Sequence, residues 1–564
     1  MSFILDMIDS LKWLTVWEMV LGAIDFFVLL RYALPVIGDR RWLDFIPGAG
    51  VLVALLSFLN GDSSLLALLF YASSAILFIC TAGRLLKSTK KPMSPKRRIT
   101  MAAVGLLGVS PVLLALFMAG EVRYNPVSDF SHKSYSEAFV AMNERLSVEY
   151  PFGDWKKIDW EETRKRYEPL FAKAEKDKDS TLYYKTLRDY LFSFRDGHIR
   201  IENDRLYENN EAFRRKVGGG VGISALRLDN GNVVVCLVLP GSPADKAGIE
   251  LGAVIVSWDG KAAREALEQT TWSEKPMATE GEKLYQQGRF MTRSPIGKQV
   301  RTEWRNPGKD DVESATLTAY DDQYETLKRT TVKLKKEELP VEGRIVGKDY
   351  GYIKIRYFLP GEKQSDPAKE LEKLLLEFQK KKIKGLVLDL RDNPGGDDDM
   401  VANMAGHFVS EKRIYEYVSY YNRYTGDFRI NRVETRTVKP SKVNYSGKIA
   451  VLVNHNTGSS GEGLPLFLKG LPNVRIVGFT STNGSFGVVS APIEMKMPGG
   501  FTVRFPDGRS LNRDKTIQGD SDDRGIGGAA PDLVVPMDDR TFRTTVIDGQ
   551  DAELNVAMAF LENG

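Results

Sequence analysis

The hydrophobic pattern divides the chain near residue 120, with a mostly apolar part before it and a mixed pattern typical of water-soluble domains after it. In the first part, four apolar stretches are long enough to cross a bilayer as a helix, which takes about 20 residues. These stretches are residues 13–37, 42–59, 64–83 and 100–120. Buried helices of a soluble domain are the alternative, but a soluble core does not use four such runs in so short a length. The pattern predicts a four-helix transmembrane region over residues 1–120.

Basic residues in the loops between these stretches predict their orientation. The loop over residues 84–99 is rich in lysine and arginine, and Arg40 and Arg41 lie between the first two stretches. The remaining loop, NGDSS, has no basic residue. Because basic loops stay in the cytoplasm, the fourth stretch is expected to run outward. We therefore expect a multi-pass protein of the cell membrane, with everything after residue 120 on the extracytoplasmic side.

Residues 121–215 have the apolar spacing of a helical domain. The segments SYSEAFVAMNERLSVEY and DWEETRKRYEPLFAKAEKD repeat apolar residues at helical intervals, and Asp159 is placed to cap the second of them. A third helix is expected near STLYYKTLRDYLFSF, and it leads into Asp196, Gly197 and His198. A strand-like alternation follows. The pattern predicts a helical domain that ends in this DGH motif.

Residues 216–330 change to short strands and glycines, in the order seen in PDZ domains. A hairpin is expected at residues 229–231, and the segment GSPA over residues 241–244 is expected to open a short helix. A backbone amide cradle beside an exposed sheet edge binds peptide tails by strand addition. The residues expected to form this cradle are Gly220, Val221, Gly222 and Ile223. We predict a β-rich PDZ-like domain, with a purely structural β-rich spacer as the alternative.

Residues 339–564 alternate strands and helices. The segments GYIKIRYF, GLVLDLR, KIAVLVN and NVRIVGF have strand patterns, and PAKELEKLLLEFQKKK has one apolar helical face. This alternation predicts parallel crossovers, and ligands of such sheets lie at the carboxyl ends of the strands. Two glycine-rich turns fall at such ends, one at residues 393–396 and one at residues 457–460. The expected fold class is therefore N-terminal transmembrane α-helices, a helical segment, a β-rich PDZ-like domain and an α/β catalytic core.

The composition narrows the classes of function. A chain of 564 residues is expected to hold several domains. The net charge of +4, from 78 basic and 74 acidic residues, gives little support to nucleic acid as a partner. Two cysteines exclude a disulfide scaffold and a multi-cysteine zinc site. Four histidines leave few candidates for a catalytic base.

The turn at residues 457–460 carries the candidate nucleophiles, Ser459 and Ser460. A serine at a tight strand-to-helix turn exposes its hydroxyl beside helix amides that can hold an oxyanion. The spacing from Ser459 to Glu462 is also that of a capping box, and spacing alone favours this helix-cap interpretation. The turn with Gly395 and Gly396 has the same two interpretations. The acidic residues 397–399 are expected to stabilise the start of a helix, with a metal site as the weaker alternative.

A serine nucleophile also needs a base. His198 follows Gly197 in the DGH motif, and His455 lies four residues before Ser459. His407 lies in a predicted helix and His132 in a linker. A single histidine is more often structural than catalytic, so the residue types leave the choice open.

The chain from about residue 134 to its end resembles the C-terminal processing, or tail-specific, peptidase family S41, serine peptidases that include the tricorn core protease. The matching segments, in the family's order, are IDWEETRKRYEPL, DGHIRI, the PDZ-like segment, GYIKIRYF, LVLDLRDNPGG, VLVNHNTGSSGE and GGAAPDLVV. The resemblance implies an α/β core of the tail-specific protease type with Ser459 as the nucleophile. It also implies that the backbone amides of Ser460 and Gly396 form the oxyanion hole.

The sequence departs from the family in two places. The tail-specific branch has a lysine base in the stretch that here reads VGFTSTNGSFGVV, with Gly484 and Ser485 but no lysine. The tricorn-like branch takes a histidine base from the segment before the core, which implies His198. That branch orients its histidine with an acid shortly before the Pro-Asp motif. The acids here are Asp520, Asp522 and Asp523 in place of a glutamate, and Asp523 is the one we expect in this role.

The resemblance implies a serine endopeptidase, and the apolar stretches with their basic loops predict that it is membrane-anchored and extracytoplasmic. It would bind C-terminal tails of protein or peptide substrates through the PDZ-like domain and would need no metal or other cofactor. Its partners would be these substrates and the lipid bilayer, with no nucleic acid. The missing lysine motivates the alternative, a catalytically inactive membrane-bound peptide-binding sensor or scaffold. A transporter with an appended domain is less favoured, because the apolar stretches hold few polar groups.

Overall fold

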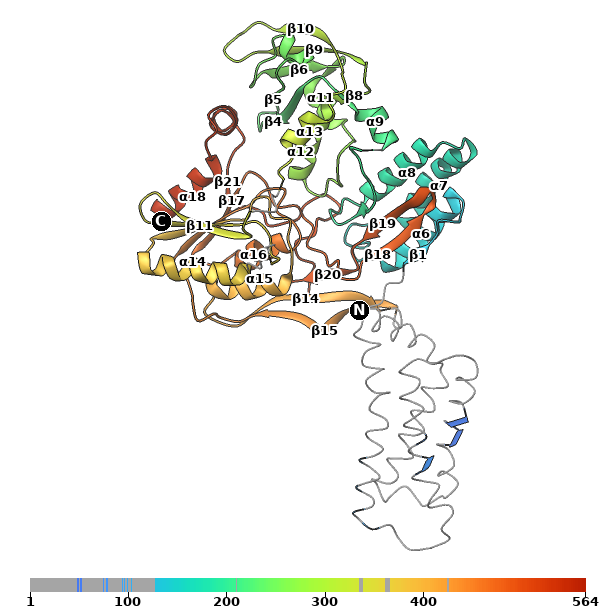
Figure 1. Ribbon diagram of the computed structural model, residues 1–564, viewed down its shortest axis with the longest axis vertical. Coiled ribbons are helices and arrows are strands. Elements are labelled where there is room, and N and C mark those ends of the chain that lie inside the picture. The colour runs from blue at the N-terminus through green and yellow to red at the C-terminus, as the bar shows by residue number, and fades with distance from the viewer. Residues whose placement is uncertain are drawn as a thin grey trace. The chain divides into compact units, whose positions relative to one another are not determined.

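The computed structural model describes residues 127–563, except for residues 209, 334–337, 361–365 and 423–425, and a few isolated positions between residues 48 and 103. The chain forms two compact units, one of residues 1–124 with 422–427 and one of residues 125–421 with 428–564. All elements named below belong to the second unit apart from the ends of one hairpin, and Figure 1 shows them in colour.

The expected fold class is wrong in its first part, the N-terminal transmembrane α-helices. Within the part of the chain that the structure describes, no helix combines the length and the apolar character that a membrane crossing requires. The fold is an α/β core built on sheets. The expected spans lie outside the described residues, apart from isolated positions. The error has a physical reason. Apolar content shows which segments avoid water, but the fold class depends on which strands pair, and paired strands can be distant in the sequence. The expected location at the cell membrane stays a prediction.

The largest hydrophobic core surrounds a six-stranded sheet in the order β11-β12-β13-β16-β17-β21. From β12 to β21 the neighbouring strands run parallel, which confirms the expected crossovers. Helices α14, α15 and α16 pack on one face and α18 on the other, so both faces are covered, as is usual for parallel sheets. The strands are β11 (Val341–Val346), β12 (Tyr350–Ile355), β13 (Gly385–Asp389), β16 (Lys448–Leu452), β17 (Val474–Gly478) and β21 (Leu533–Val534). The helices are α14 (Pro367–Lys381), α15 (Asp398–Ala405), α16 (Ser460–Leu468) and α18 (Ala552–Asn563).

A second sheet, in the order β10-β9-β6-β5-β4 with β7 beside β6, forms the β-rich region over residues 219–330. The expected hairpin is confirmed, because β4 and β5 pair in antiparallel fashion around residues 229–231. Strand β4 lies at the edge of this sheet, and α12 packs against it. The strands are β4 (Ile223–Arg227), β5 (Val233–Val238), β6 (Val254–Trp258), β7 (Lys261–Ala262), β9 (Gln299–Arg305) and β10 (Glu313–Thr318). The helices are α10 (Pro243–Lys246), α11 (Ala263–Glu268), α12 (Glu280–Met291) and α13 (Glu325–Thr330). The PDZ assignment stays a prediction.

The expected helical segment is confirmed by α6, α7 and α8, and Asp159 caps α7 as expected. The hydrophobic core of these helices includes strands β18 and β19 from the far end of the chain. Strand β2, directly after the DGH motif, pairs with β19, so the motif is anchored to a sheet whose other strands are distant in sequence (Figure 1). The helices are α6 (Tyr135–Glu149), α7 (Trp160–Lys176), α8 (Ser180–Ser193) and α9 (Glu211–Val217). The strands are β1 (Ser128–Asp129), β2 (Arg200–Ile201), β18 (Ile493–Met497) and β19 (Phe501–Phe505).

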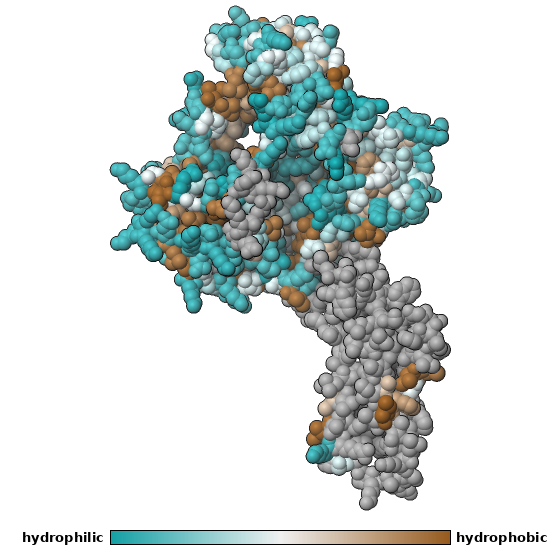
Figure 2. Space-filling view, viewed as in Figure 1, coloured by the Kyte–Doolittle hydropathy of each residue, from teal (hydrophilic) through white to brown (hydrophobic). Residues whose placement is uncertain are grey.

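The remaining elements connect these parts. Strands β14, β15 and β20 form a small sheet, β3 pairs with β8, and α17 with the following π-helix lies near the C-terminus. Figure 2 shows a mostly hydrophilic face over the described residues, with apolar residues in separate groups. The elements are β3 (Gly219–Gly220), β8 (Arg293–Ser294), β14 (Arg413–Asn422), β15 (Asp427–Val438), β20 (Gly508–Leu511), α17 (Asp539–Phe542) and the π-helix (Arg543–Ile547). The boundaries expected at residues 1–120, 121–215, 216–330 and 339–564 stay predictions.

Candidate active site

Ser459 lies at the turn between β16 and α16. Its backbone has φ 51° and ψ −136°, a conformation that residues with a side chain rarely adopt. A strained strand-to-helix turn of this kind holds a serine hydroxyl exposed at the end of a sheet. Ser459 is half-buried, whereas Ser460 is buried and its hydroxyl donates to the carbonyl oxygen of Gly396 at 3.0 Å. Of the two candidate serines, Ser459 therefore has the available hydroxyl.

The helix-cap interpretation of Ser459 is wrong. Its side chain makes no capping hydrogen bond to α16. Glu462, which would have completed the capping box, instead accepts hydrogen bonds from the amides of Gly484 at 2.8 Å and Ser485 at 2.7 Å. Burial raises the pKa of the Glu462 carboxyl to about 7. Glu462 therefore joins α16 to the segment that follows β17.

The Gly395-Gly396 turn lies directly against the serine turn. The φ angles of these residues are +109° and +150°, which favour glycine. A Cβ atom on Gly395 would lie 2.8 Å from the Cβ of Ser459, and one on Gly396 would lie 2.5 Å from the carbonyl oxygen of Phe358. In the described part of the chain, the amides of Gly396 and Ser460 have no hydrogen-bond acceptor. Both amides are therefore free to stabilise negative charge that develops beside Ser459.

The acidic residues after this turn stabilise a helix, as expected. Asp397 is the N-cap of α15, and its carboxylate accepts hydrogen bonds from the amides of Asp399 at 2.7 Å and Met400 at 3.3 Å. Negative charge at this end complements the helix dipole. The interpretation of residues 397–399 as a helix start is confirmed.

The DGH motif reaches the serine turn through Ser485. The amide of Gly197 donates to the hydroxyl of Ser485 at 3.0 Å. The amide of Ser459 donates to the carbonyl oxygen of the same residue at 2.9 Å. The fold thus joins two motifs whose linking residues, Gly197 and Ser485, are 288 positions apart in the sequence.

His198 is half-buried, and its Nδ1 atom is buried with no hydrogen-bond partner in the described part of the chain. Its backbone amide donates to the Asp196 carboxylate at 2.9 Å, and the Tyr150 hydroxyl donates to the other oxygen of that carboxylate at 2.7 Å. Burial lowers the pKa of His198, the nearby charges of Arg200 and Arg504 lower it further, and Asp196 opposes them. The imidazole is therefore neutral at neutral pH, as a general base must be.

The three acids expected near the histidine have different surroundings. Asp523 forms an ion pair with Lys157 at 2.9 Å, with 30% of its side chain exposed. Asp522 accepts hydrogen bonds within its own turn. Asp520 is buried, and burial together with the nearby charge of Asp196 raises the pKa of its carboxyl well above the usual range. The structure places Asp523 in a surface ion pair and Asp520 in the interior.

The other histidines have contacts that suit structural roles. The Nδ1 atom of His407 lies 2.6 Å from a backbone carbonyl oxygen, and His132 is exposed. The Nδ1 atom of His455 lies 3.0 Å from the carboxylate of Glu282, and its ring packs on Tyr285 with centroids 4.2 Å apart. His455 therefore links α12 to the residues that lead into the serine turn.

The segment that contains this site matches a known family. Residues 349–535 match the family described as Peptidase family S41. The segment that holds Ser459 and the Gly395-Gly396 turn is therefore similar to S41 peptidases.

Several S41 relatives carry names that describe proteolysis. The carboxy-terminal processing protease CtpB of Bacillus subtilis (strain 168) is 25% identical over 268 residues, which are 46% of this chain and 46% of that protein. A probable CtpA-like serine protease of Staphylococcus aureus (strain COL) is 28% identical over 295 residues, 51% of this chain and 49% of that protein. The chain spans about half the length of the curated relatives it matches.

A solved structure shares the fold of this chain. Mature CPAF complexed with lactacystin superposes with a TM-score of 0.54 at 13% sequence identity, over 77% of this chain and 99% of that one. The similarity concerns the fold alone.

In the β-rich region, the four residues expected to bind a peptide carboxylate are all buried. These residues are Gly220, Val221, Gly222 and Ile223. Gly220 exchanges backbone hydrogen bonds with Tyr320, and the hydroxyl of Thr292 donates to the carbonyl oxygen of Ile223 at 2.8 Å. A Cβ atom on Gly288 of α12 would lie 2.1 Å from the carbonyl oxygen of Ala225 in β4. The edge of β4 is therefore covered by the protein's own helix.

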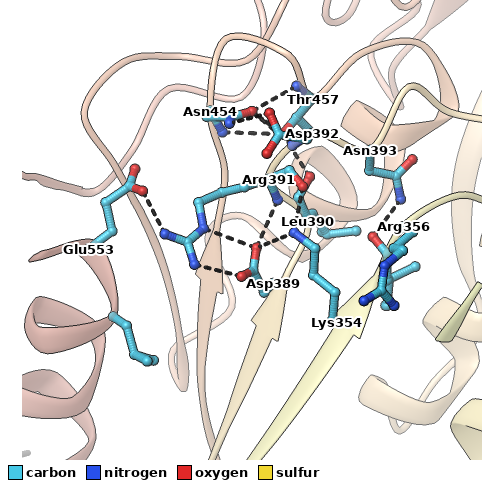
Figure 3. A network of polar contacts seen from close by, with 12 residues as sticks. Lys354, Arg356, Asp389, Leu390, Arg391, Asp392, Asn393, Asn454, Thr457 and Glu553 are labelled. Carbon is cyan, nitrogen blue, oxygen red and sulfur yellow. Dashed lines mark hydrogen bonds and ion pairs between the residues drawn. The ribbon is translucent and has the colours of Figure 1, made fainter. Parts of the chain in front are cut away.

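A network of charges holds the carboxyl end of β13 in the S41 domain (Figure 3). Arg391 pairs with Asp389 at 2.6 Å, Asp551 at 2.7 Å and Glu553 at 2.8 Å, and Lys354 pairs with Asp389 at 3.0 Å. Burial alone would raise the pKa of Asp389, but hydrogen bonds and charge from Arg391 outweigh it and hold that pKa well below its usual range. The network fixes the end of β13 and thereby the start of the Gly395-Gly396 turn.

Sequence reasoning did not identify two residues, Ser485 and Glu462, as contributors to the structure of the site. Ser485 entered only as a place where a lysine is lacking, and Glu462 only as part of a capping box. The signal for Ser485 was its position in the stretch that carries the base of the tail-specific branch. For Glu462 no sequence signal was available, because its partners lie after the next strand.

Proposed function

We propose that the protein is a serine endopeptidase that hydrolyses peptide bonds of polypeptide substrates, with Ser459 as the nucleophile. One observation carries the proposal: the strained turn that holds the Ser459 hydroxyl beside the free amides of Ser460 and Gly396. The match of residues 349–535 to family S41 and the proteolytic names of the relatives support it.

The proposed reaction is acyl transfer through a covalent intermediate. The Ser459 hydroxyl oxygen attacks the carbonyl carbon of the scissile bond while His198 takes the hydroxyl proton. The amides of Ser460 and Gly396 donate hydrogen bonds to the oxyanion of the tetrahedral intermediate. The imidazolium then gives its proton to the leaving amine, and an ester remains on Ser459. Water hydrolyses this ester by the same steps, with His198 again as the base.

His198 is the base in this proposal because the DGH motif is joined to the serine turn through Ser485. No hydrogen bond joins the imidazole to the Ser459 hydroxyl among the described residues, and such bonds are often long before substrate binds. The carboxylate beside the histidine is Asp196. Asp523 is left out of the proposed machinery, because its carboxylate is paired with Lys157.

For substrate binding we propose that a polypeptide C-terminal tail adds to the edge of β4. Two observations support this role. Strand β4 lies at the edge of its sheet, and Gly220, shortly before β4, has a short backbone pairing with Tyr320. Because α12 covers that edge, binding requires α12 to move away from β4. The four cradle residues, Gly220, Val221, Gly222 and Ile223, are expected to become accessible only then.

Active-site labelling and peptide cleavage test the proposed function. A fluorophosphonate should label the protein at Ser459, as mapped by mass spectrometry. Ser459→Ala should lose labelling and lower peptide cleavage by at least about 1,000-fold, because removal of a nucleophile leaves only residual stabilisation. The same variant should bind tail peptides with unchanged affinity. Cleavage by Ser459→Ala at the wild-type rate would exclude Ser459 as the nucleophile, and an unlabelled protein that still binds tails would support the peptide-binding sensor instead.

A further inference from the structure

Among the described residues, four hydrogen bonds join Ser485 to different parts of the site. Its amide donates to Glu462 at 2.7 Å, and its carbonyl oxygen accepts from the amide of Ser459 at 2.9 Å. Its hydroxyl accepts from the amide of Gly197 at 3.0 Å and donates to the side-chain oxygen of Asn483 at 2.7 Å. Ser485 is 2% exposed. Its hydroxyl is therefore buried, and its two hydrogen bonds define its orientation.

The hydroxyl of Ser485 joins the DGH motif to the serine turn. Within the described part of the chain, the backbone of Ser485 forms hydrogen bonds with Ser459 of the serine turn and Glu462 of α16, and these bonds do not depend on the side chain at position 485. The bond to Gly197 uses the side chain alone. Gly197 directly precedes His198, so a shift of this amide moves the imidazole by a similar distance.

The partner of this hydroxyl is also fixed. Asn483 accepts its proton, and the amide nitrogen of the Asn483 side chain donates to the carbonyl oxygen of His455 at 3.1 Å. The backbone amide of Asn483 donates to the carbonyl oxygen of Thr457 at 2.8 Å. Because the proton of the Ser485 hydroxyl is directed to Asn483, a lone pair of its oxygen is directed to Gly197.

We propose that Ser485 is a positioning residue that holds the His198 loop against the serine turn through its hydroxyl. The inference rests on the proposed function, because it gives His198 the role of base. Ser485 lies in the stretch where the tail-specific branch has its lysine, and here it transfers no proton. It contributes by fixing the distance between two groups that react. A displacement of about 1 Å at a catalytic group costs on the order of 100-fold in rate.

Kinetics of peptide hydrolysis by the full chain test this inference with three variants. Ser485→Ala removes the acceptor for Gly197, and Ser485→Thr keeps it. Ser273→Ala is the matched control, since Ser273 is 0% exposed and its hydroxyl accepts from Arg188 at 3.1 Å, a contact that does not involve the DGH motif. The rate constant kcat, the KM, the pH profile of kcat/KM and the thermal unfolding midpoint are measured for each.

We expect Ser485→Ala to lower kcat by about 10- to 100-fold with KM nearly unchanged. The acid limb of kcat/KM reports the base of the free enzyme. Loosening the loop exposes His198, which now lies among Asp196 of its own loop, Arg200 of β2 and Arg504 of β19. The acid limb should therefore move to higher pH, toward the ordinary histidine value. Ser485→Thr and Ser273→Ala should keep wild-type kcat within about threefold and the wild-type profile.

A folded Ser485→Ala protein with wild-type kcat and an unshifted acid limb would overturn the inference, and so would an equal loss in Ser273→Ala. If Ser485→Ala does not fold, Ser485→Cys takes its place with the same outcomes, because a thiol is of similar size but a weak acceptor. The proposed function fails separately. If Ser459→Ala or His198→Ala keeps wild-type activity, the catalytic assignment is wrong. If both are inactive while Ser485→Ala is not impaired, only the role of Ser485 is wrong.

Discussion

Gly197 shows how a contact, rather than a backbone angle, can require glycine. A Cβ atom at this position would lie 2.3 Å from the hydroxyl oxygen of Ser485 and 2.4 Å from the side-chain oxygen of Asn483. Both atoms belong to buried residues that are hydrogen-bonded to each other. The middle residue of the DGH motif is therefore fixed by the segment after β17, which the motif must approach for His198 to reach Ser459.

Gly197→Ala should push the histidine loop away from the serine turn. We expect kcat for peptide hydrolysis to fall by about 100-fold or more, with destabilisation of about 1–3 kcal/mol from overpacking. Steady-state kinetics and chemical denaturation measure the two effects. Gly470→Ala is a suitable control, because Gly470 has φ +85° with open space around its Cβ position. It should cost stability through backbone strain but leave kcat unchanged, and a Gly197→Ala enzyme with wild-type kcat would contradict the proposed loop contact.

At the scale of elements, helix α12 contacts both the β-rich region and the site. One part of the helix lies on β4 through Gly288. Another part carries Glu282, whose buried carboxylate pairs with Lys275 at 3.2 Å and with His455 at 3.0 Å. Burial alone would raise the pKa of Glu282, but Lys275 and His455 outweigh it and lower the pKa to about 2. Any movement of α12 that frees β4 therefore strains contacts next to the serine turn.

The lowered pKa of Glu282 predicts a stabilisation that is lost in acid. The unfolded chain has the ordinary glutamate value of 4.5, so the stabilisation is complete above about pH 4.5 and disappears as pH falls toward 2. Glu282→Gln should lower the free energy of unfolding by about 1–3 kcal/mol at pH 7, and the difference from wild type should shrink between pH 4.5 and 2. Urea denaturation at a series of pH values measures this. A difference that is the same at pH 7 and pH 2.5 would show that the ion pair contributes nothing.

At the scale of the whole molecule, the C-terminal residues connect the β-rich region with the main sheet. Phe542 packs with Leu228 and Val234 of the β-rich region. Nearer the C-terminus, Asp551 and Glu553 pair with Arg391 at the end of β13. The same short segment therefore stabilises two parts of the protein. One is the β-rich region proposed to bind tails, and the other is the end of β13, which leads into the Gly395-Gly396 turn.

Phe542→Ala should loosen the β-rich region selectively. Removing a buried phenylalanine side chain costs about 3–5 kcal/mol, and Phe542 is 5% exposed. We expect faster amide hydrogen exchange in β4 and β5, with little change in β13 and β16. Hydrogen exchange followed by mass spectrometry resolves these segments. Phe542→Leu, which keeps most of the apolar contact, should show a smaller effect, and equal acceleration in all four strands would contradict a local role.

Local signals predicted most of the elements around the site. The alternation of residues 339–564 predicted the parallel strands, and their glycines predicted the two turns at the carboxyl ends, because periodicity and turn chemistry depend on near neighbours. Asp159 was recognised as a helix cap, and residues 397–399 as the charged start of a helix, for the same reason. The expected fold class was wrong in its transmembrane helices, because local patterns reveal apolar content but not which strands pair.

Several features of this protein depend on contacts between distant segments. Spacing favoured Ser459 as a helix cap, yet its backbone is strained, its side chain makes no capping bond and Glu462 binds distant partners. No pattern in the sequence indicated that Ser485 would contact Gly197, or that α12 would cover the edge of β4. The chain by itself determined its strands, turns and candidate residues, since these follow from interactions over a few positions. Which of those residues meet was decided by packing of segments hundreds of positions apart, where shape and buried hydrogen bonds select one arrangement.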